Sequence, residues 1–211
     1  MNSRTLYSLL VLVGFFIVAF PVKAQDSTFI KVHFLYGSVP VDSFKEEEPE
    51  WFGGLLGGHV GIEIDTNRVL HFVPQGGLHI IGRVKKNFKS HFAQSDTTSF
   101  WGIFGTPADS VKRLSVEMKV SAKQKHDLDS IAIAYRSKVP YDYAFFGMRC
   151  ASATYDVLSA AGILKYYHPK VNYPQHFYPA LFRKKLLARA EDHQWDLYRR
   201  EGTYRRKWEE D

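Results

Sequence analysis

The chain has 211 residues, with 28 Lys and Arg against 22 Asp and Glu, so its formal net charge is +6. Hydrophobic residues make up 45% of the chain and charged residues 24%, which excludes a disordered or fibrous protein. The length suits a single domain with one sizeable core. Aromatic residues, at 15%, favour a fold built on a β-sheet, because aromatic side chains fit its half-buried pleated surface.

Residues 1–24 have the pattern of a secretory signal peptide. Arg4 supplies a positive charge, residues 6–20 are apolar, and the small residues Val22 and Ala24 stand at the two positions that signal peptidase reads, so cleavage is expected after Ala24. An uncleaved membrane anchor is the alternative, but the apolar run is shorter than the roughly 18 residues that a spanning helix needs, and Pro21 closes it. We therefore expect export to the periplasm or secretion.

Alternating and apolar runs predict a sheet of about five or six strands. The runs lie at residues 28–36, 59–64, 68–73, 78–84, 99–104 and 114–120. Asp65, Thr66 and Asn67 have the composition of a tight turn, so the second and third runs are expected to form an antiparallel hairpin.

Two helices are expected after the strands. Ser121 is a suitable N-cap for a helix that reaches about residue 137, with apolar side chains at helical spacing. A second helix is predicted over residues 150–161, and Gly162 stops it. Together with the sheet, these helices predict an α+β fold, in which an antiparallel sheet packs against helices.

Cys150, the only cysteine, opens the second predicted helix. A lone thiol in an exported protein is either buried and inert or kept for its reactivity. The free N–H groups and the dipole at a helix N-terminus stabilise a thiolate, so this position predicts a lowered thiol pKa. We therefore interpret Cys150 as a candidate nucleophile.

His59 and His71 are the candidate bases, because a cysteine nucleophile needs an imidazole that can move its proton. His59 opens one strand of the predicted hairpin and His71 lies toward the far end of the other, so the two rings should meet across the strands. The alternatives are two polar residues on a half-exposed sheet, or a metal cluster that also includes His79 and His91. No cysteines or paired carboxylates stand at ligand spacing, so we expect no metal and no cofactor.

Residues 58–72 (GHVGIEIDTNRVLHF) resemble the histidine hairpin of the lecithin:retinol acyltransferase family and its bacterial YiiX-like relatives. These proteins form the circularly permuted branch of the NlpC-type papain-like superfamily, in which the histidine strand precedes the cysteine helix. The order of His59, His71 and Cys150 matches that branch. The resemblance covers about residues 55–163 and implies a permuted papain-like fold.

The resemblance also implies a role for each candidate residue. Cys150 would be the nucleophile, His59 the general base and His71 the residue that orients it, with Glu63 as a competitor for that third role. Tyr141, which follows Pro140, is similar to a tyrosine that stabilises the oxyanion in NlpC-type enzymes. The chain departs from the acyltransferases around the nucleophile, where their Asn-Cys-Glu-His-Phe is replaced by Arg149-Cys150-Ala151-Ser152-Ala153.

The sequence divides into a signal peptide, a hydrolase domain over residues 25–177 and a basic helical extension over residues 178–211. Basic clusters in the extension are of a kind that binds nucleic acid, but an exported chain rarely meets nucleic acid. Contact with an anionic envelope surface is the better functional interpretation. A solvated helix packed on the domain, with no binding role, is the interpretation that we favour over either contact.

These features predict an exported cysteine hydrolase that acts on an amide or ester, as an amidase, peptidase or acyl hydrolase or transferase. Aromatic residues precede both His59 and Cys150, which favours a lipid acyl group as substrate. Arg149 keeps a peptidoglycan peptide open as the alternative substrate. A non-catalytic module that binds the cell envelope through the same scaffold is the alternative function.

Overall fold

The computed structural model describes residues 27–48, 52, 57–76, 79–81 and 90–211. The predicted signal peptide lies outside the described residues. No helix in the described ranges is long and apolar enough to cross a membrane.

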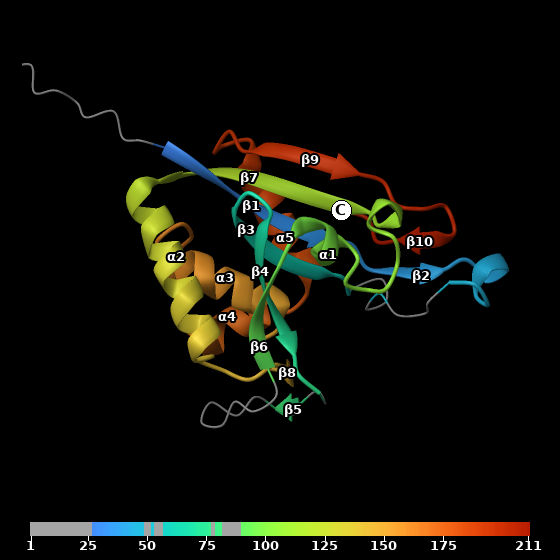
Figure 1. Cartoon of the computed structure of the whole chain (residues 1–211), viewed down its shortest axis with the longest axis horizontal. Helices are drawn as coiled ribbons and strands as arrows, with labels where there is room; N and C mark the ends of the chain where they lie inside the picture. The colour runs from blue at the N-terminus through green and yellow to red at the C-terminus, as the bar shows by residue number, and fades with distance from the viewer. Residues whose placement is uncertain (1–26, 49–51, 53–56, 77–78, 82–89) are drawn as a thin grey trace, which may run out of the picture.

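A six-stranded antiparallel sheet forms the centre of the molecule, in the order β6-β4-β3-β1-β7-β9 (Figure 1). Its strands are β1 (Ser27–Leu35), β3 (His59–Asp65), β4 (Arg68–Pro74), β6 (Ser90–Ser95), β7 (Arg113–Ser121) and β9 (Asp196–Arg200). Every registered pair in this sheet is antiparallel. The predicted α+β class, the sheet of five or six strands and the β3–β4 hairpin are thus confirmed.

Two short pairs of strands flank the main sheet. β2 (Ser38–Pro40) pairs with β10 (Arg206–Trp208) in antiparallel fashion. β5 (His79–Ile81) pairs in parallel with β8 (Ala144–Phe146), which lies just before the cysteine helix. The run predicted over residues 78–84 therefore forms a separate two-stranded sheet where it is described, and the rest of that run lies outside the described residues.

The helices surround the sheet unequally. They are α1 (Thr97–Trp101), α2 (Ala122–Ser137), α3 (Cys150–Ala160), α4 (Pro169–Gln175) and α5 (Pro179–Ala190), with 3-10 turns η1 (Asp42–Phe44) and η3 (Ala108–Ser110). Ser121 and Gln124 form a capping box at the start of α2, as the Ser121 N-cap predicts. The helix that Cys150 opens is also confirmed.

Each face of the sheet has its own apolar cluster, because alternate residues of a strand point to opposite sides. The larger cluster joins Val32 of β1 and Ile62 of β3 to residues of α2, α3 and α5. The smaller cluster joins Leu35 and Val69 to Phe100 of α1 and its neighbours. In Figure 1, α2 and α3 lie together at the left of the strands, apart from α1.

The strand predicted over residues 99–104 is wrong, because this segment contains the end of α1 followed by a turn. Asp96 caps the helix and accepts hydrogen bonds from the amide and the hydroxyl of Ser99. Phe100 and Trp101 are adjacent in the sequence and both are buried in the smaller cluster. A strand would point these two side chains to opposite faces, whereas one helical turn places both against the sheet.

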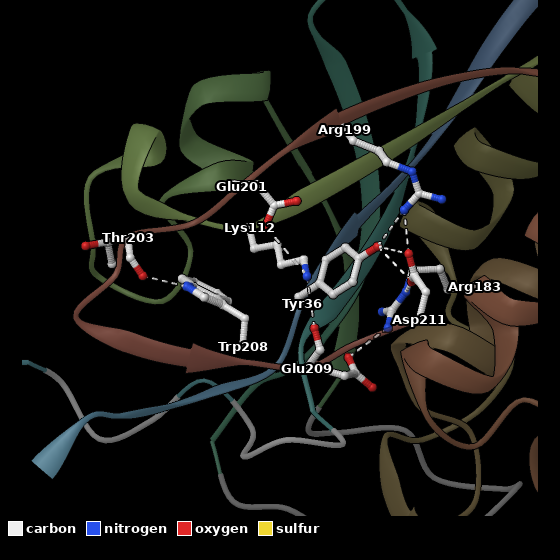
Figure 2. A network of polar contacts seen from close by, with 9 residues as sticks. All are labelled: Tyr36, Lys112, Arg183, Arg199, Glu201, Thr203, Trp208, Glu209 and Asp211. Carbon is white, nitrogen blue, oxygen red and sulfur yellow. Dashed lines mark hydrogen bonds and ion pairs between the residues drawn. The ribbon is translucent and has the colours of Figure 1, made fainter.

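The prediction that residues 178–211 are helical is correct for α5 and wrong for the residues that follow. β9 extends the main sheet along β7, and β10 pairs with β2. Figure 2 shows how polar contacts hold this segment: Asp211 accepts hydrogen bonds from the Tyr36 hydroxyl at 2.8 Å and from Arg183 Nε at 2.7 Å. Strand pairing to a distant part of the chain leaves no periodic signal in so short a segment, which explains the error.

Several arginines of this basic segment pair with acids of the same chain. Arg183 lies 3.1 Å from Glu209, and Arg200 Nη1 lies 2.8 Å from Asp109. Arg205 Nη1 lies 3.0 Å from Glu47. The Arg200 and Arg205 pairs therefore hold the C-terminal segment to the domain, and the Arg183 pair joins two parts of the segment itself. Contact with an anionic envelope surface stays a prediction.

Candidate active site

Cys150 is the first residue of α3, and its side chain is buried, with 3% of the residue exposed. The residue before it, Arg149, is the N-cap, and its backbone amide donates to Ser152 Oγ at 2.8 Å. Because α3 packs on the helix-covered face of the sheet, the thiol reaches the sheet from that side. The N-terminal position in a helix predicted from sequence is confirmed.

The sulfur of Cys150 contacts the strand that carries His59. Cys150 is buried in the same cluster as Val60, Tyr143 packs against that cluster, and the Val60 and Ala151 amides and the Tyr143 hydroxyl all act to lower the pKa of the thiol. The pairing of β3 with β4 ends at Gly61 and His71. His59 and Val60, at the start of β3, therefore lie beyond the last paired residues of the hairpin. The thiol therefore lies at the residue directly after His59.

Two glycines shape the start of β3. Gly58 has a φ of +85°, and a Cβ there would lie 2.1 Å from the Leu35 carbonyl oxygen, so only glycine fits the entry to the strand. At Gly61 a Cβ would lie 2.8 Å from the Phe100 ring, so the missing side chain makes room for that ring. Both glycines thus fix the surroundings of His59.

His59 and His71 contact each other directly, as the sequence predicts. His59 Nε2 lies 3.0 Å from His71 Nδ1, and the two rings meet at right angles with centroids 5.1 Å apart. His71 Nε2 in turn lies 3.2 Å from Ser95 Oγ. When His71 donates to Ser95 and His59 donates to His71, the other ring nitrogen of His59, Nδ1, carries a free lone pair. This tautomer leaves His59 able to accept a proton.

The imidazole pair and the thiol approach β3 from opposite faces of the sheet. The side chains of His59 and Val60 leave the strand on opposite sides. The His59 ring lies 5.6 Å from the Phe100 ring of α1, centroid to centroid, whereas α3 packs with Val60 in the larger cluster. The imidazole pair therefore lies in the layer with α1, and the thiol lies in the layer with α3.

Burial sets the charge state of these groups. It lowers the pKa of His59 well below its usual range, and the neighbouring His71 adds to this effect. Burial, and then the charge of His91, lowers the pKa of His71 to about 4. Burial also raises the pKa of the Cys150 thiol, although Arg149 and the hydrogen bonds to the sulfur oppose the shift. The thiol and both imidazoles are thus neutral at rest.

The lowered thiol pKa predicted from the helix N-terminus is therefore wrong. The dipole and the first amides of α3 are present, but the loss of solvent around the sulfur outweighs them. The sequence locates the helix end, but does not reveal how deeply the thiol is buried.

Tyr143 is the tyrosine at the sulfur, whereas Tyr141 points elsewhere. The Tyr141 hydroxyl donates to Asp156 Oδ2 at 3.3 Å, and its ring lies against Phe72. Burial and the neighbouring Cys150 both raise the pKa of Tyr143. Its position two residues after Tyr141 in the same aromatic loop is the only sequence signal that identifies it.

Glu63 does not reach the His59 pair in this structure. Its carboxylate lies 2.9 Å from His33 Nε2 and also accepts the Asn67 amide at 2.8 Å. His71 is thus the residue in contact with His59, and Glu63 belongs to a different histidine. In the described ranges, no three His, Cys, Asp or Glu side chains group as metal ligands.

A pocket of about 330 Å³ lies beside the loop that leads into Cys150. Apolar side chains dominate its lining, among them Ile81, Phe146, Met148 and Tyr173. Ile81 and Phe146 are paired across β5 and β8, and both are more than half exposed. The loop that leads into Cys150 therefore borders a largely apolar pocket, and Cys150 itself is not part of the pocket lining.

Comparison with protein-family models found no match, and neither the curated proteins nor the solved structures include a chain that matches this one.

Proposed function

We propose that the chain is an exported cysteine hydrolase, with a permuted papain-like fold, that cleaves an amide or ester through an acyl-thioester on Cys150. The observation that carries the proposal is the pair of contacts at the start of β3. There the His59 and His71 rings are hydrogen-bonded at 3.0 Å, and Cys150 is buried in the same apolar cluster as the next residue, Val60. The YiiX-like and acyltransferase resemblance joins the same three residues.

The proposed reaction begins from neutral groups. His59 takes the thiol proton as the sulfur attacks the carbonyl carbon of the substrate, so the thiolate forms only in that step. His71 Nδ1 accepts a hydrogen bond from the resulting His59 imidazolium, and His71 Nε2 donates to Ser95 Oγ, so this chain of hydrogen bonds stabilises the charge while His59 keeps the proton. His59 then protonates the leaving amine or alcohol, and water releases the acyl group.

The oxyanion needs donors at the position where its charge develops. The Cys150 amide at the start of α3 supplies one, and the Tyr143 hydroxyl beside the sulfur supplies a second. The raised pKa of Tyr143 keeps this phenol protonated and able to donate. This assignment moves the role expected for Tyr141 to its neighbour two residues later.

The substrate that fits this approach best is a lipid acyl group or another hydrophobic acyl ester. The apolar pocket beside the Cys150 loop and the exposed Ile81 and Phe146 support this choice. Arg149 is the cation that a peptidoglycan peptide would need, but its guanidinium lies 4.7 Å from the Phe177 ring and 5.5 Å from the Tyr178 ring. Peptidoglycan peptides remain the alternative substrate.

The experiment is to incubate the mature protein with a labelled phospholipid or acyl ester and, separately, with purified muropeptides. Acid quenching and mass spectrometry should find an acyl group on the Cys150 peptide, and Cys150→Ala should show none. His193→Ala is the matched control, because this exposed histidine stacks on Trp195 far along the chain from the hairpin. Release of a stem-peptide fragment without lipid acylation would assign the substrate to the cell wall. Turnover of neither substrate would contradict the enzyme proposal.

One observation favours the second candidate, a non-catalytic envelope-binding module. Cys150 is 3% exposed, and burial raises its thiol pKa, as expected for a structural cysteine. A thiol that small alkylating reagents reach only after denaturation would support this function over hydrolysis.

A further inference from the structure

Ser115, His33 and Glu63 lie in line across three neighbouring strands of the main sheet. Ser115 of β7 is the register partner of His33 in β1, and Glu63 stands on the adjacent strand β3. The Ser115 Oγ lies 2.8 Å from His33 Nδ1, and Glu63 Oε2 lies 2.9 Å from His33 Nε2. This cluster is separate from the residues around Cys150.

The donor and the acceptor of each hydrogen bond in this cluster can be assigned. Glu63 has its pKa lowered, first by the hydrogen bond with His33, so it is an ionised acceptor. His33 must therefore donate from Nε2, and in its neutral form Nδ1 then has only a lone pair. That lone pair accepts the Ser115 hydroxyl proton. The arrangement is that of a general base held by a carboxylate and aimed at a hydroxyl.

The surroundings keep His33 neutral and fixed. His33 is 2% exposed, and the Trp101 ring lies edge-on to it at a centroid distance of 4.6 Å. Burial lowers the pKa of His33, and Glu63 partly offsets that effect. An unprotonated imidazole is the form that can take a proton from a hydroxyl.

Ser115 opens into a pocket of about 360 Å³, on the far side of His33 from Glu63. Trp101, Tyr198, Arg113 and Arg200 line it. Arg113 and Arg200 are register partners on β7 and β9, so two positive side chains stand beside each other near the hydroxyl. Arg200 also pairs with the exposed Asp109 at the edge of the sheet. The pocket therefore suits a ligand that carries a negative charge.

We propose that Ser115, His33 and Glu63 form a second nucleophilic centre, which takes a small ester with an anionic group. Ser115 Oγ bonds to the carbonyl carbon while its proton passes to His33 Nδ1. The ester C–O bond then breaks, and the alcohol leaves with that proton. Water, deprotonated by His33, displaces the acyl group and regenerates the hydroxyl. Glu63 is a positioning residue, since it acts through His33.

The test uses a fluorophosphonate probe on the Cys150→Ala chain, in which the thiol is gone. The probe forms a bond from Ser115 Oγ to phosphorus and loses fluoride, and His33 accepts the hydroxyl proton. Mass spectrometry should locate the adduct on the peptide with Ser115, and Ser115→Ala should abolish it. Ser130→Ala is the matched control, because that serine lies on α2 and donates to the His126 carbonyl. A folded chain without an adduct on Ser115 would overturn the proposal.

The role of Glu63 has its own measurement. Glu63→Gln keeps the shape of the side chain, and we expect labelling to slow by roughly tenfold or more. The charged groups that act on His33 are Glu63, Lys31 and Arg113, and only the carboxylate raises its pKa. The pH midpoint of labelling should therefore move to lower pH in Glu63→Gln. An unchanged rate and midpoint would show that Glu63 has only a structural role and would overturn the three-residue assignment.

Discussion

The two histidine clusters of this molecule lie on the same face of one sheet but have different partners. At the start of β3, His59 contacts the neutral imidazole of His71, which continues to Ser95. In the middle of β1, His33 contacts the carboxylate of Glu63 and the hydroxyl of Ser115. Burial lowers the pKa of all three rings. The two clusters therefore differ in the hydrogen-bond partners of their imidazoles and not in the burial of the rings.

The difference shows what a carboxylate does for a buried imidazole. Glu63 fixes which nitrogen of His33 carries the proton and supports a positive charge on the ring. His59 has no acid among its described contacts, so its tautomer depends on His71 and Ser95, and an imidazolium there is supported only by neutral acceptors. We therefore expect His59 to carry a positive charge only briefly, during the transfer of a proton.

Removing the candidate nucleophile Cys150 gives the largest expected effect on turnover of the acyl substrate. Cys150→Ala should abolish acyl-enzyme formation and lower turnover of the acyl substrate by roughly a thousandfold or more, because no other thiol exists in the chain. Ser115→Ala should leave that turnover unchanged, because its cluster is separate. Steady-state rates of both variants test this, and a loss in Ser115→Ala as large as in Cys150→Ala would show that the two clusters are one site.

The two histidines of the hairpin should differ in effect. His59→Ala should abolish acylation of Cys150, while His71→Ala should leave turnover that is roughly ten to a hundredfold weaker but detectable, since an orienting residue matters less than the base. Single-turnover acylation rates measure the difference, with His193→Ala as the control. Equal and small losses in both variants would show that the pair is structural.

Acid should destabilise the fold through the histidines that burial keeps neutral. A histidine with a pKa of about 6.5 when unfolded and about 4 when folded, as for His71, contributes stability that is complete above pH 6.5 and is lost as the pH falls toward 4. The expected loss is about 3 kcal/mol for His71 alone. Urea unfolding of the parent chain and of His71→Gln between pH 7 and pH 4 measures it. The same slope in both proteins would refute this origin.

The thiol should react at higher pH than an ordinary cysteine, which is the smallest of these effects. Because burial raises the pKa of Cys150, the midpoint of alkylation should lie above the value of about 8.5 that free cysteine shows. Alkylation with iodoacetamide across pH 6–11 measures this midpoint, and denatured protein provides the reference. A midpoint below that of the denatured chain would mean that a thiolate is stabilised at rest.

The sequence predicts those parts of the site that depend on local pattern. Alternation and a polar turn locate His59 and His71 on one hairpin, and the N-terminal position of Cys150 follows from helical periodicity and a stop at Gly162. The sequence does not predict which side chains contact each other when the contact depends on tertiary packing. From the sequence, Tyr141 and Tyr143 are equally suitable as the tyrosine beside the sulfur, because both lie in the same loop. Only tertiary contacts place Tyr143 near the sulfur and direct Tyr141 to Asp156.

Long-range pairing explains the remaining errors. His33 and Ser115 are far apart in the sequence, and their contact requires β1 and β7 to be neighbours in a given register. α1 is too short for helical periodicity to reveal it, and its buried Phe100 and Trp101 are as suitable for a strand. The signal peptide and the division into domains stay predictions.

β9 affects how the chain can fold. It pairs with β7 between Glu117 and Asp196, so the edge of the sheet closes only when residues distant in the chain come together, which is intrinsically slow. Until then β7 has one side free to pair with a strand of another copy, the usual route to aggregation. The contacts of Asp211 with Tyr36 and Arg183 anchor the end of this late segment. By pairing with β7, β9 therefore removes the long strand β7 from the edge of the sheet and leaves the shorter β9 there.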